Sequence, residues 1–167
     1  MNLKLAQLEQ SQEIGNLVNQ AYRGKTGWTK EGHLVSGDRV SSKQIEDIIL
    51  NENSYLLITQ NKIDITSCIC IEKKTNNAYF GLFAVNPNIQ SKGIGKKVLK
   101  LAEEYTKDIL KLKKITMVVI SQREELISYY ERRGYVKINI NQEYPKYLDV
   151  GTPKIEGLTI DYLEKTI

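Results

Sequence analysis

A predicted strand and a predicted long helix are joined by the segment Phe83-Ala84-Val85-Asn86-Pro87-Asn88-Ile89-Gln90-Ser91-Lys92-Gly93-Ile94-Gly95-Lys96. Pro87 blocks continuation of the strand, and Gly93 and Gly95 lack Cβ atoms, so a ligand can approach the backbone closely. The unpaired N–H groups of the first helical turn converge beside the positive end of the helix dipole. We therefore expect this loop to bind a phosphate or pyrophosphate, with Lys92 and Lys96 adding positive charge.

The residues around this segment show hydrophobic periodicities of both kinds, helical and alternating. Before it, they predict a strand at 3–6, a helix that Ser11 caps, a second helix from 41 or 42 to 50, and antiparallel strands at 55–59, 63–72 and 78–85. After it, they predict a helix at 92–110, a buried strand at 115–120, a helix at 124–133, and strands at 136–140 and 158–163. The order βααβββαβαββ predicts an α/β (α+β) fold with a single mixed, mostly antiparallel central sheet flanked by helices. No repeat or linker divides residues 1–167, so we expect one domain.

Composition limits the classes of protein that fit. The chain has 167 residues, 41% hydrophobic and 26% charged, which is typical of a soluble globular domain. No apolar run approaches the roughly 20 residues that cross a bilayer, and the N-terminus lacks the features of a signal peptide, so we expect a cytoplasmic protein without membrane contact. The net charge of +4 is mild. A nucleic-acid partner is not expected, because no dense basic stripe with interleaved aromatic residues is present.

Metal binding is not expected either. Cys68 and Cys70 are the only cysteines and His33 is the only histidine, too few for an ordinary four-ligand zinc site without carboxylates. The two cysteines stand two positions apart on a predicted strand, so their side chains point to the same face and are poorly placed to bridge each other. We expect two small buried apolar side chains.

Other phosphate-binding loops fit the segment less well. A nucleotide-hydrolase loop needs four residues between its glycines, whereas one residue separates Gly93 from Gly95. A dinucleotide-binding loop needs a third glycine at position 98, where this chain has Val98.

Two motifs in register resemble the GNAT superfamily of N-acetyltransferases. The first is Gln90-x-x-Gly93-x-Gly95 after the strand end, which is similar to the family's cofactor loop. The second lies some 30 residues later and runs from Arg123 to Tyr135, where Tyr130 and Gly134 match the family's Tyr-x-x-x-Gly-aromatic helix end. The resemblance covers roughly residues 55–140, and the earlier strand and helices fit the family's N-terminal part.

The resemblance implies acetyl-CoA as cosubstrate and assigns roles to residues of this chain. The backbone of Phe83 and Val85 would lie along the pantetheine arm and the acetyl carbonyl, where an N–H group stabilises a developing oxyanion. Tyr130 would protonate the departing thiolate. Arg123 stands where the family often has asparagine, and it would either bind the cofactor or cap the preceding strand. The groups implied around the pyrophosphate are the backbone N–H groups of Gln90, Ser91, Lys92, Gly93, Ile94 and Gly95, with Lys96 next to them.

The sequence says less about the general base and about the residues that bind the acceptor amine. No carboxylate lies on residues 79–83, so the general base is either Glu72 at the end of the preceding strand or a water chain. Trp28 and Glu31 fall in the connection that walls the acceptor pocket in this family, and they would suit a cationic amine through cation–π contact and charge pairing. In the alternative interpretation Trp28 packs beneath the loop and the acidic residues are solvated.

Three functions are compatible with the sequence. The leading prediction is an N-acetyltransferase that acts on a small primary amine. The alternatives are a regulatory module that binds acetyl-CoA without catalysis and an acetyltransferase for protein lysines or N-termini. The family resemblance also makes a homodimer plausible.

Overall fold

The fold is organised around a seven-stranded sheet whose strands come from both ends of the chain. The computed structural model describes residues 1–90 and 92–167. The strand order is β1-β3-β4-β5-β6-β9-β7, and among the described residues β5 and β6 pair in parallel while the other neighbours pair antiparallel. The predicted mixed, mostly antiparallel sheet is therefore confirmed. The strands are β1 (Lys4–Leu5), β3 (Ser54–Gln60), β4 (Ile65–Lys73), β5 (Ala78–Val85), β6 (Lys114–Ile120), β7 (Val136–Glu143) and β9 (Thr159–Thr166).

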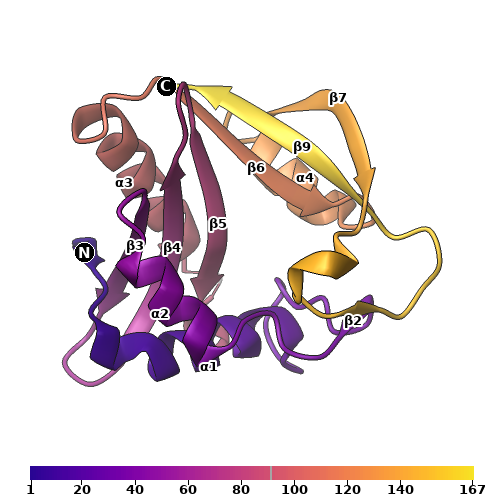
Figure 1. Ribbon diagram of the computed structural model, residues 1–167, viewed down its shortest axis with the longest axis horizontal. Helices are drawn as coiled ribbons and strands as arrows, with labels where there is room; N and C mark the ends of the chain where they lie inside the picture. The colour runs from indigo at the N-terminus through magenta and orange to yellow at the C-terminus, as the bar shows by residue number, and fades with distance from the viewer. Residues whose placement is uncertain (91) are drawn as a thin grey trace.

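Helices cover both faces of the sheet (Figure 1). On one face, α1 (Ser11–Arg23) and α2 (Ser42–Leu50) pack against a core that includes Cys68 and Cys70. On the other face, α3 (Ile94–Asp108) and α4 (Glu124–Glu131) pack against a core that includes Ile69 and Ile71. Strand β4 is thus buried on both sides. As predicted, both cysteines are buried and free.

The N-terminal ends of α1 and α2 test the two helix caps that the sequence predicted. Ser41 caps α2 as expected, because its Oγ accepts a hydrogen bond from the Gln44 backbone N–H while the Gln44 side chain accepts one from the Ser41 N–H. The cap predicted at Ser11 is wrong. A short 3₁₀ helix, Leu8–Gln10, runs directly into α1, so Ser11 already lies inside the helix.

A second, two-stranded sheet was not expected from the sequence. It pairs β2 (Val35–Ser36) with β8 (Thr152–Pro153). Each strand has two residues, which is too short to show an alternating pattern. Further 3₁₀ helices occur at Pro87–Ile89 and Lys146–Leu148.

Strands β5 and β6 separate soon after they begin to pair. Residues 78–80 of β5 lie opposite 115–117 of β6, and beyond them the two strands diverge (Figure 1). Leu82 adopts a left-handed backbone (φ 46°), and the register of β5 against β4 shifts at this point. A bulge of this kind bends a strand and leaves a residue outside the ladder. It therefore opens the middle of the sheet.

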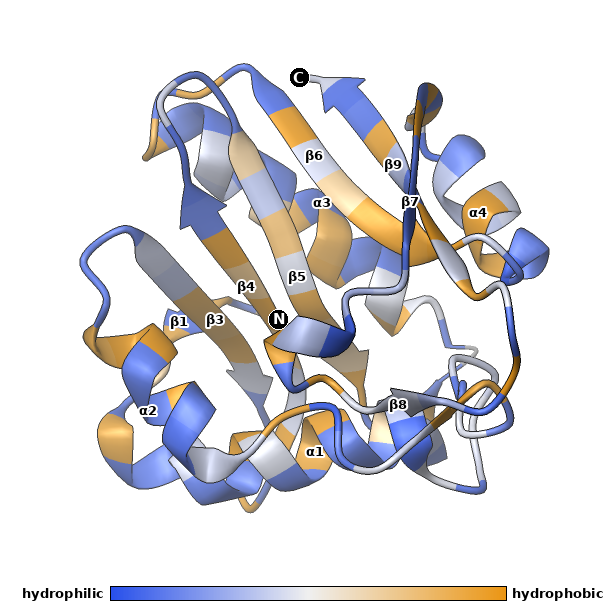
Figure 2. Ribbon diagram, turned by 45° about the vertical axis from the view of Figure 1, so that its right-hand side comes forward, coloured by the Kyte–Doolittle hydropathy of each residue, from blue (hydrophilic) through white to orange (hydrophobic). Residues whose placement is uncertain are grey.

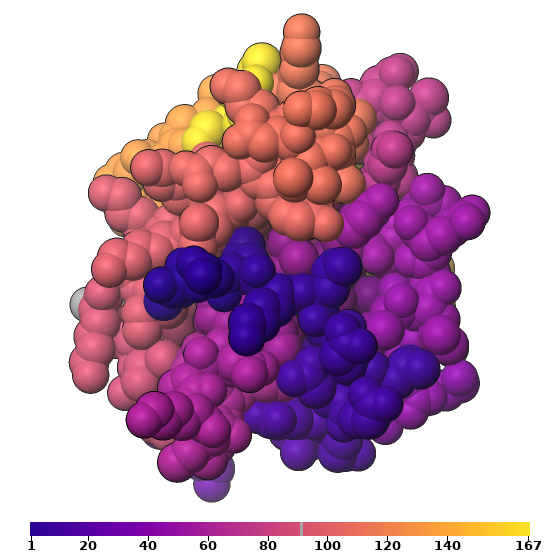
Figure 3. Space-filling view, turned by 90° about the vertical axis from the view of Figure 1, so that its left-hand side faces the viewer, coloured from indigo at the N-terminus to yellow at the C-terminus, as the bar shows by residue number. Residues whose placement is uncertain are grey.

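The hydropathy of the strands follows their positions in the sheet. Figure 2 shows hydrophobic colour along much of β4 and β6, whereas β7, the edge strand, is mostly hydrophilic and exposed. Figure 3 shows the N-terminal segment lying across one face of the molecule, where β1 pairs with β3. None of the helices in the described residues is both long and apolar enough to span a membrane.

Asn19 on α1 anchors the segment that leads into α2. Its Oδ1 accepts hydrogen bonds from the backbone N–H groups of Arg39 (2.8 Å) and Val40 (3.1 Å), and its Nδ2 donates to the Val40 carbonyl (2.8 Å). Three bonds from one side chain therefore hold residues 39 and 40 against the helix.

We expect Asn19→Ala to lower the free energy of unfolding by about 2 kcal/mol, because two partly buried backbone N–H groups lose their acceptor. Urea denaturation measures this change. Asn16→Ala on the same helix is the matched control, since Asn16 is exposed and accepts a single bond from Gln12. A loss for Asn19→Ala no larger than that of the control would contradict the anchoring role.

Candidate active site

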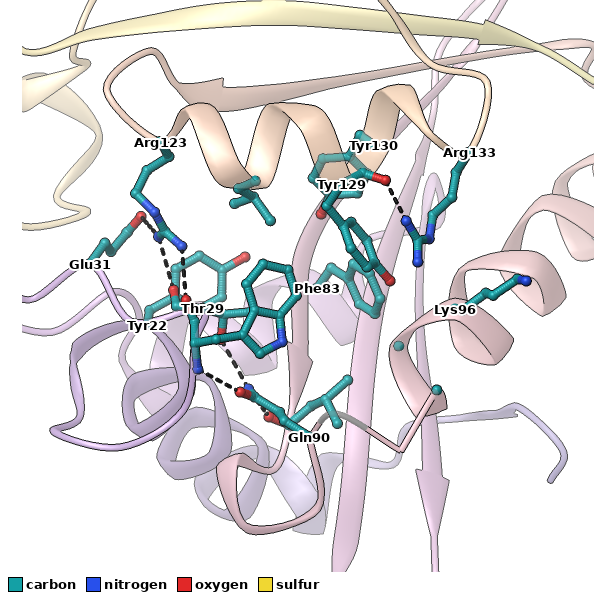
Figure 4. A pocket seen from close by; sticks show the side chains of 15 residues that line it. Tyr22, Thr29, Glu31, Phe83, Gln90, Lys96, Arg123, Tyr129, Tyr130 and Arg133 are labelled. Atoms are coloured by element: carbon teal, nitrogen blue, oxygen red, sulfur yellow. Dashed lines mark hydrogen bonds and ion pairs between the residues drawn. The ribbon is translucent and has the colours of Figure 1, made fainter.

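A cavity of ≈ 270 Å³ lies where β5 leads into α3, beneath α4 (Figure 4). Its walls come from α1, the loop after α1, the end of β5, the start of α3, and α4. The lining residues are Tyr22, Trp28, Thr29, Glu31, Phe83, Val85, Gln90, Gly93, Gly95, Lys96, Arg123, Leu126, Tyr129, Tyr130 and Arg133.

The start of α3 forms one wall and leaves its backbone N–H groups available. Gly93 precedes the helix in the left-handed conformation (φ 74°), and no side chain caps the helix. A Cβ on Gly95 would lie 3.2 Å from the Tyr129 Oη and 3.7 Å from the Phe83 Cζ. A side chain at position 95 would therefore fill the cavity, and glycine keeps it open. Lys96, in the first turn of this helix, lines the same wall, and its side chain extends outward (Figure 4).

Arg133, just after α4, brings a second cation to the cavity. Its guanidinium lies over the Tyr129 ring, 3.4 Å from the ring centroid, and its Nη1 donates to the Tyr129 carbonyl at 2.5 Å. The Arg133 Nε is buried and has no hydrogen-bond partner among the described residues. Because an unpaired buried donor is costly, this atom favours an anionic ligand in the cavity.

The loop after α1 is tied to the cofactor-loop candidate by Gln90. The Gln90 Nε2 donates to the Val85 carbonyl and to the Thr29 Oγ1, both at 3.0 Å, and its Oε1 accepts from the Trp28 N–H at 3.0 Å. Figure 4 shows these contacts at the floor of the cavity. The Gln90 side chain is therefore used to position the loop.

Arg123 holds the same loop from α4. Its side chain is 3% exposed, and its Nη1 and Nη2 donate to the carbonyls of Thr29 (3.0 Å) and Trp28 (3.3 Å). Its Nε donates to Glu125 at 2.5 Å. Near it, Glu31 forms an ion pair with Arg23, and both side chains are largely buried.

Tyr130 stands in an aromatic stack on the inner face of α4. Its ring centroid lies 5.3 Å from that of Tyr129 and 5.7 Å from that of Tyr135, both edge-on. Burial, followed by the nearby Tyr22 phenol, raises the pKa of Tyr130 well above its usual range. The phenol is therefore protonated, and a protonated phenol can donate a proton.

A second cavity, of ≈ 120 Å³, occupies the opening between β5 and β6. It shares Tyr22, Glu31, Phe83, Leu126 and Tyr130 with the first cavity, so the two meet at the Tyr130 side chain. Its other lining residues are Arg39, Ile69, Tyr79, Phe80, Gly81, Leu82, Met117, Val118, Val119, Ile120, Tyr144, Pro145, Val150 and Ile160.

Most of the residues singled out in the sequence gather at the first cavity. They are Trp28, Glu31, Phe83, Val85, Gln90, Gly93, Gly95, Lys96, Arg123 and Tyr130.

Four predicted site residues remain: Ser91, Lys92, Ile94 and Glu72. Ser91 lies outside the described residues, Lys92 is exposed, and Ile94 packs against the core. Glu72 is paired with Lys74 and lines a separate groove with Asp47. The structure therefore does not bring Glu72 together with Tyr130.

Five residues of the first cavity were not among the predicted site residues: Tyr22, Thr29, Leu126, Tyr129 and Arg133. Arg133 follows Tyr130 by three positions, which is close to one helical turn, and this spacing could have identified it. The positions of Thr29 and Tyr129 depend on contacts across about 100 residues of sequence, which no local pattern reports.

Solved structures share the fold at low sequence identity. The ribosomal-protein-S18-alanine N-acetyltransferase of Escherichia coli is 12% identical, with a TM-score of 0.74 over 99% of this chain and 93% of that one. The spermidine N-acetyltransferase of Vibrio cholerae, in complex with CoA and spermine, is 17% identical, with a TM-score of 0.72 over 99% and 94% of the two chains. At these identities the likeness establishes the fold.

A curated relative is the S-(2-succino)cysteine N-acetyltransferase of Bacillus subtilis (strain 168). It is 41% identical over 56 residues, which are 33% of this chain and 34% of the relative. The match therefore spans about a third of the length of each protein.

The sequence pattern of the acetyltransferase (GNAT) domain matches residues 27–147, well over half of the chain. This region contains the end of β5, the uncapped start of α3, and the helix that carries Tyr130. The chain therefore belongs to the GNAT family of acetyltransferases.

Proposed function

We propose that this protein transfers the acetyl group of acetyl-CoA to a small primary amine, with Tyr130 as general acid. The observation that carries the proposal is the meeting of two cavities at Tyr130 and Phe83. A transfer between two molecules needs a site for each and a shared point where the reacting atoms meet. Membership of the GNAT family supports acetyl-CoA as the donor.

The first cavity has the groups that a coenzyme A pyrophosphate needs. The uncapped α3 N-terminus offers backbone N–H groups and the positive end of a helix dipole. Gly93 and Gly95 allow the ligand to approach the backbone, and Lys96 and Arg133 provide balancing charge. The buried Arg133 Nε, which has no partner among the described residues, supports the fit.

We propose that the backbone of β5 supplies the remaining contacts to acetyl-CoA. The backbone of Phe83 and Val85 borders the cavity at the end of the strand, beside the bulge at Leu82. A free N–H there would bind the thioester oxygen and stabilise the negative charge that develops on it.

Tyr130 supplies the proton for the leaving group. The amine nitrogen bonds to the acetyl carbon, the bond from that carbon to sulfur breaks, and the sulfur takes the Tyr130 proton. The phenolate then recovers, through water, the proton that the attacking nitrogen loses, so that the amide and the free thiol are the products. The phenol is protonated before the reaction, and its elevated pKa means that the phenolate, once formed, is readily reprotonated.

Water is the better-supported route for the amine proton. Glu72 lines neither cavity and is already paired with Lys74. Glu31 lines both cavities, but it is engaged with Arg23. Trp28 lines the first cavity but not the second, and its ring lies 5.2 Å from that of Tyr129.

The second cavity favours a small acceptor over a protein. The connection between β7 and β9, through Tyr144, Pro145 and Val150, forms one of its walls. A protein lysine or N-terminus would need an open groove there. The names of the relatives include a polyamine, a protein alanine and a modified cysteine as acceptors, and they share an amine nucleophile. Tyr130 at the junction favours catalysis over the alternative of a cofactor-binding regulator.

We expect Tyr130→Phe to lower kcat by roughly tenfold or more, because the leaving thiolate loses its proton donor. Acetyl-CoA affinity should change little. Thiol release with an amine panel measures turnover, and calorimetry measures affinity. Tyr135→Phe is the matched control, since its hydroxyl donates to Glu103 at 3.0 Å and lies outside both cavities. Unchanged kcat in Tyr130→Phe would remove the acid role.

The pKa of Tyr130 also predicts the pH profile. Burial raises this pKa above the ordinary value of 10.0, so the phenol stays protonated below it. We expect kcat to show no decline from loss of the acid between about pH 7 and pH 10. Stability from burying the neutral phenol is likewise present below about pH 10 and is lost only as the pH rises through the folded-state pKa. A decline in kcat below pH 10 that Tyr130→Phe abolishes would contradict the predicted pH profile.

Arg133 is expected to bind the cofactor. Arg133→Gln should weaken acetyl-CoA binding by about tenfold or more, the usual cost of losing a hydrogen bond to a charged group. Isothermal calorimetry tests this. Arg132→Gln is the control, because Arg132 is the neighbouring arginine, is exposed, and lines neither cavity. Equal affinity of Arg133→Gln and wild type would exclude Arg133 from the cofactor site.

A further inference from the structure

Arg39 lines the second cavity, and its backbone is held in place by α1. Its backbone N–H is bonded to Asn19 of α1, and its guanidinium Cζ lies 5.6 Å from the centroid of the Tyr22 ring. The residue lines the second cavity together with Tyr79 and Tyr144. This places the charge on the acceptor side of Tyr130, outside the cavity assigned to the donor.

The guanidinium of Arg39 forms no ion pair with any residue that the structure describes. Three carboxylates line a cavity or groove with it, and each has another cation. Glu31 is paired with Arg23, Glu72 with Lys74, and Asp47 with Lys43 at 2.9 Å. The positive charge of Arg39 is therefore not neutralised within the site.

Two phenols add hydrogen-bond donors beside this charge. The hydroxyls of Tyr22 and Tyr79 have no hydrogen-bond partner among residues 1–90 and 92–167, whereas the Tyr144 hydroxyl donates to the Val150 carbonyl at 2.8 Å. Gly81 makes room for the Tyr79 ring, whose Cε1 would lie 3.3 Å from a Cβ at that position. Burial raises the pKa of Tyr79 to about 12 despite the opposing effect of Arg39, so its hydroxyl remains a donor.

The combination of a permanent cation and two free hydroxyl donors selects for an anion. A carboxylate fits it well, since guanidinium and carboxylate form two parallel hydrogen bonds. A polyamine fits less well, because the three cations Arg23, Arg39 and Arg123 outnumber the two nearby acids Glu31 and Glu125.

We propose that the acceptor is a primary amine that carries a carboxylate, such as an amino acid, and that Arg39, with Tyr22 and Tyr79, binds that carboxylate. The proposal rests on the proposed function, because it assigns the acceptor of the same reaction. It replaces the cationic acceptor that Trp28 and Glu31 suggested in the sequence.

The test compares acetylation of the standard amino acids with acetylation of their carboxamides, and includes spermidine. Each acid and amide pair differs only in the carboxylate. At saturating acetyl-CoA, we expect kcat/KM for at least one amino acid to exceed that of its amide by about tenfold to hundredfold, the range for a hydrogen bond to a charged group. The difference should lie in KM, since the carboxylate is bound away from the reacting atoms.

Variants of Arg39 link the preference to this residue. Arg39→Gln should reduce the acid-to-amide ratio to about threefold or less, and Arg39→Lys should retain part of it, because the charge remains but the paired geometry is lost. Arg132→Gln, the same change at an exposed position, should keep the wild-type ratio. The Arg39 variants should fold, since Asn19 binds the backbone of residue 39, and thermal melting checks this.

The outcomes separate this inference from the proposed function. If some amines are acetylated but acids and amides react equally, or spermidine is preferred, the carboxylate site is overturned and the acetyltransferase activity stands. A ratio that survives in Arg39→Gln would also overturn the site. If no amine in the panel releases thiol above the hydrolysis rate while acetyl-CoA binds, the proposed function fails, and the inference fails with it.

Discussion

The site depends on the early separation of two parallel strands. Strands β5 and β6 share three residue pairs, and after Phe80 their backbones diverge at the bulge around Leu82. Strand backbone that leaves a ladder must find other partners or a ligand, because buried N–H and C=O groups are rarely left unpaired. The opening also exposes the inner side of α4, so that Tyr130 reaches both cavities. Helices on both faces of the sheet keep this gap enclosed.

Much of this arrangement could be predicted from the sequence because it is encoded locally. The order of strands and helices follows from hydrophobic period, and the parallel position of β6 follows from its uninterrupted apolar run. The cofactor loop is recognisable because Gly93 and Gly95 stand at the start of an amphipathic helix. The place of Tyr130 beside that loop was implied by the resemblance of two motifs to the GNAT family.

The features that could not be predicted depend on contacts between distant segments. Gln90 was expected to contribute its backbone, yet its side chain holds Trp28 and Thr29, about 60 residues earlier. Glu72 lines a separate groove and neither of the two cavities, and the sequence of β4 carries no such information. Among the described residues Arg39 has no ion pair because its neighbouring acids pair with other cations, and no local sequence pattern reports those pairings.

The small sheet formed by β2 and β8 has a consequence for how an acceptor could enter. It joins the loop after α1 to the connection between β7 and β9, the two segments that wall the second cavity. Its ladder consists of two residue pairs, whereas β6 and β9 are joined by seven. Val35 of this ladder is fully buried in a core cluster with Tyr144, and the Lys154 backbone N–H donates to the Leu34 carbonyl at 2.8 Å. A ligand of the second cavity would therefore have to enter without separating these two segments.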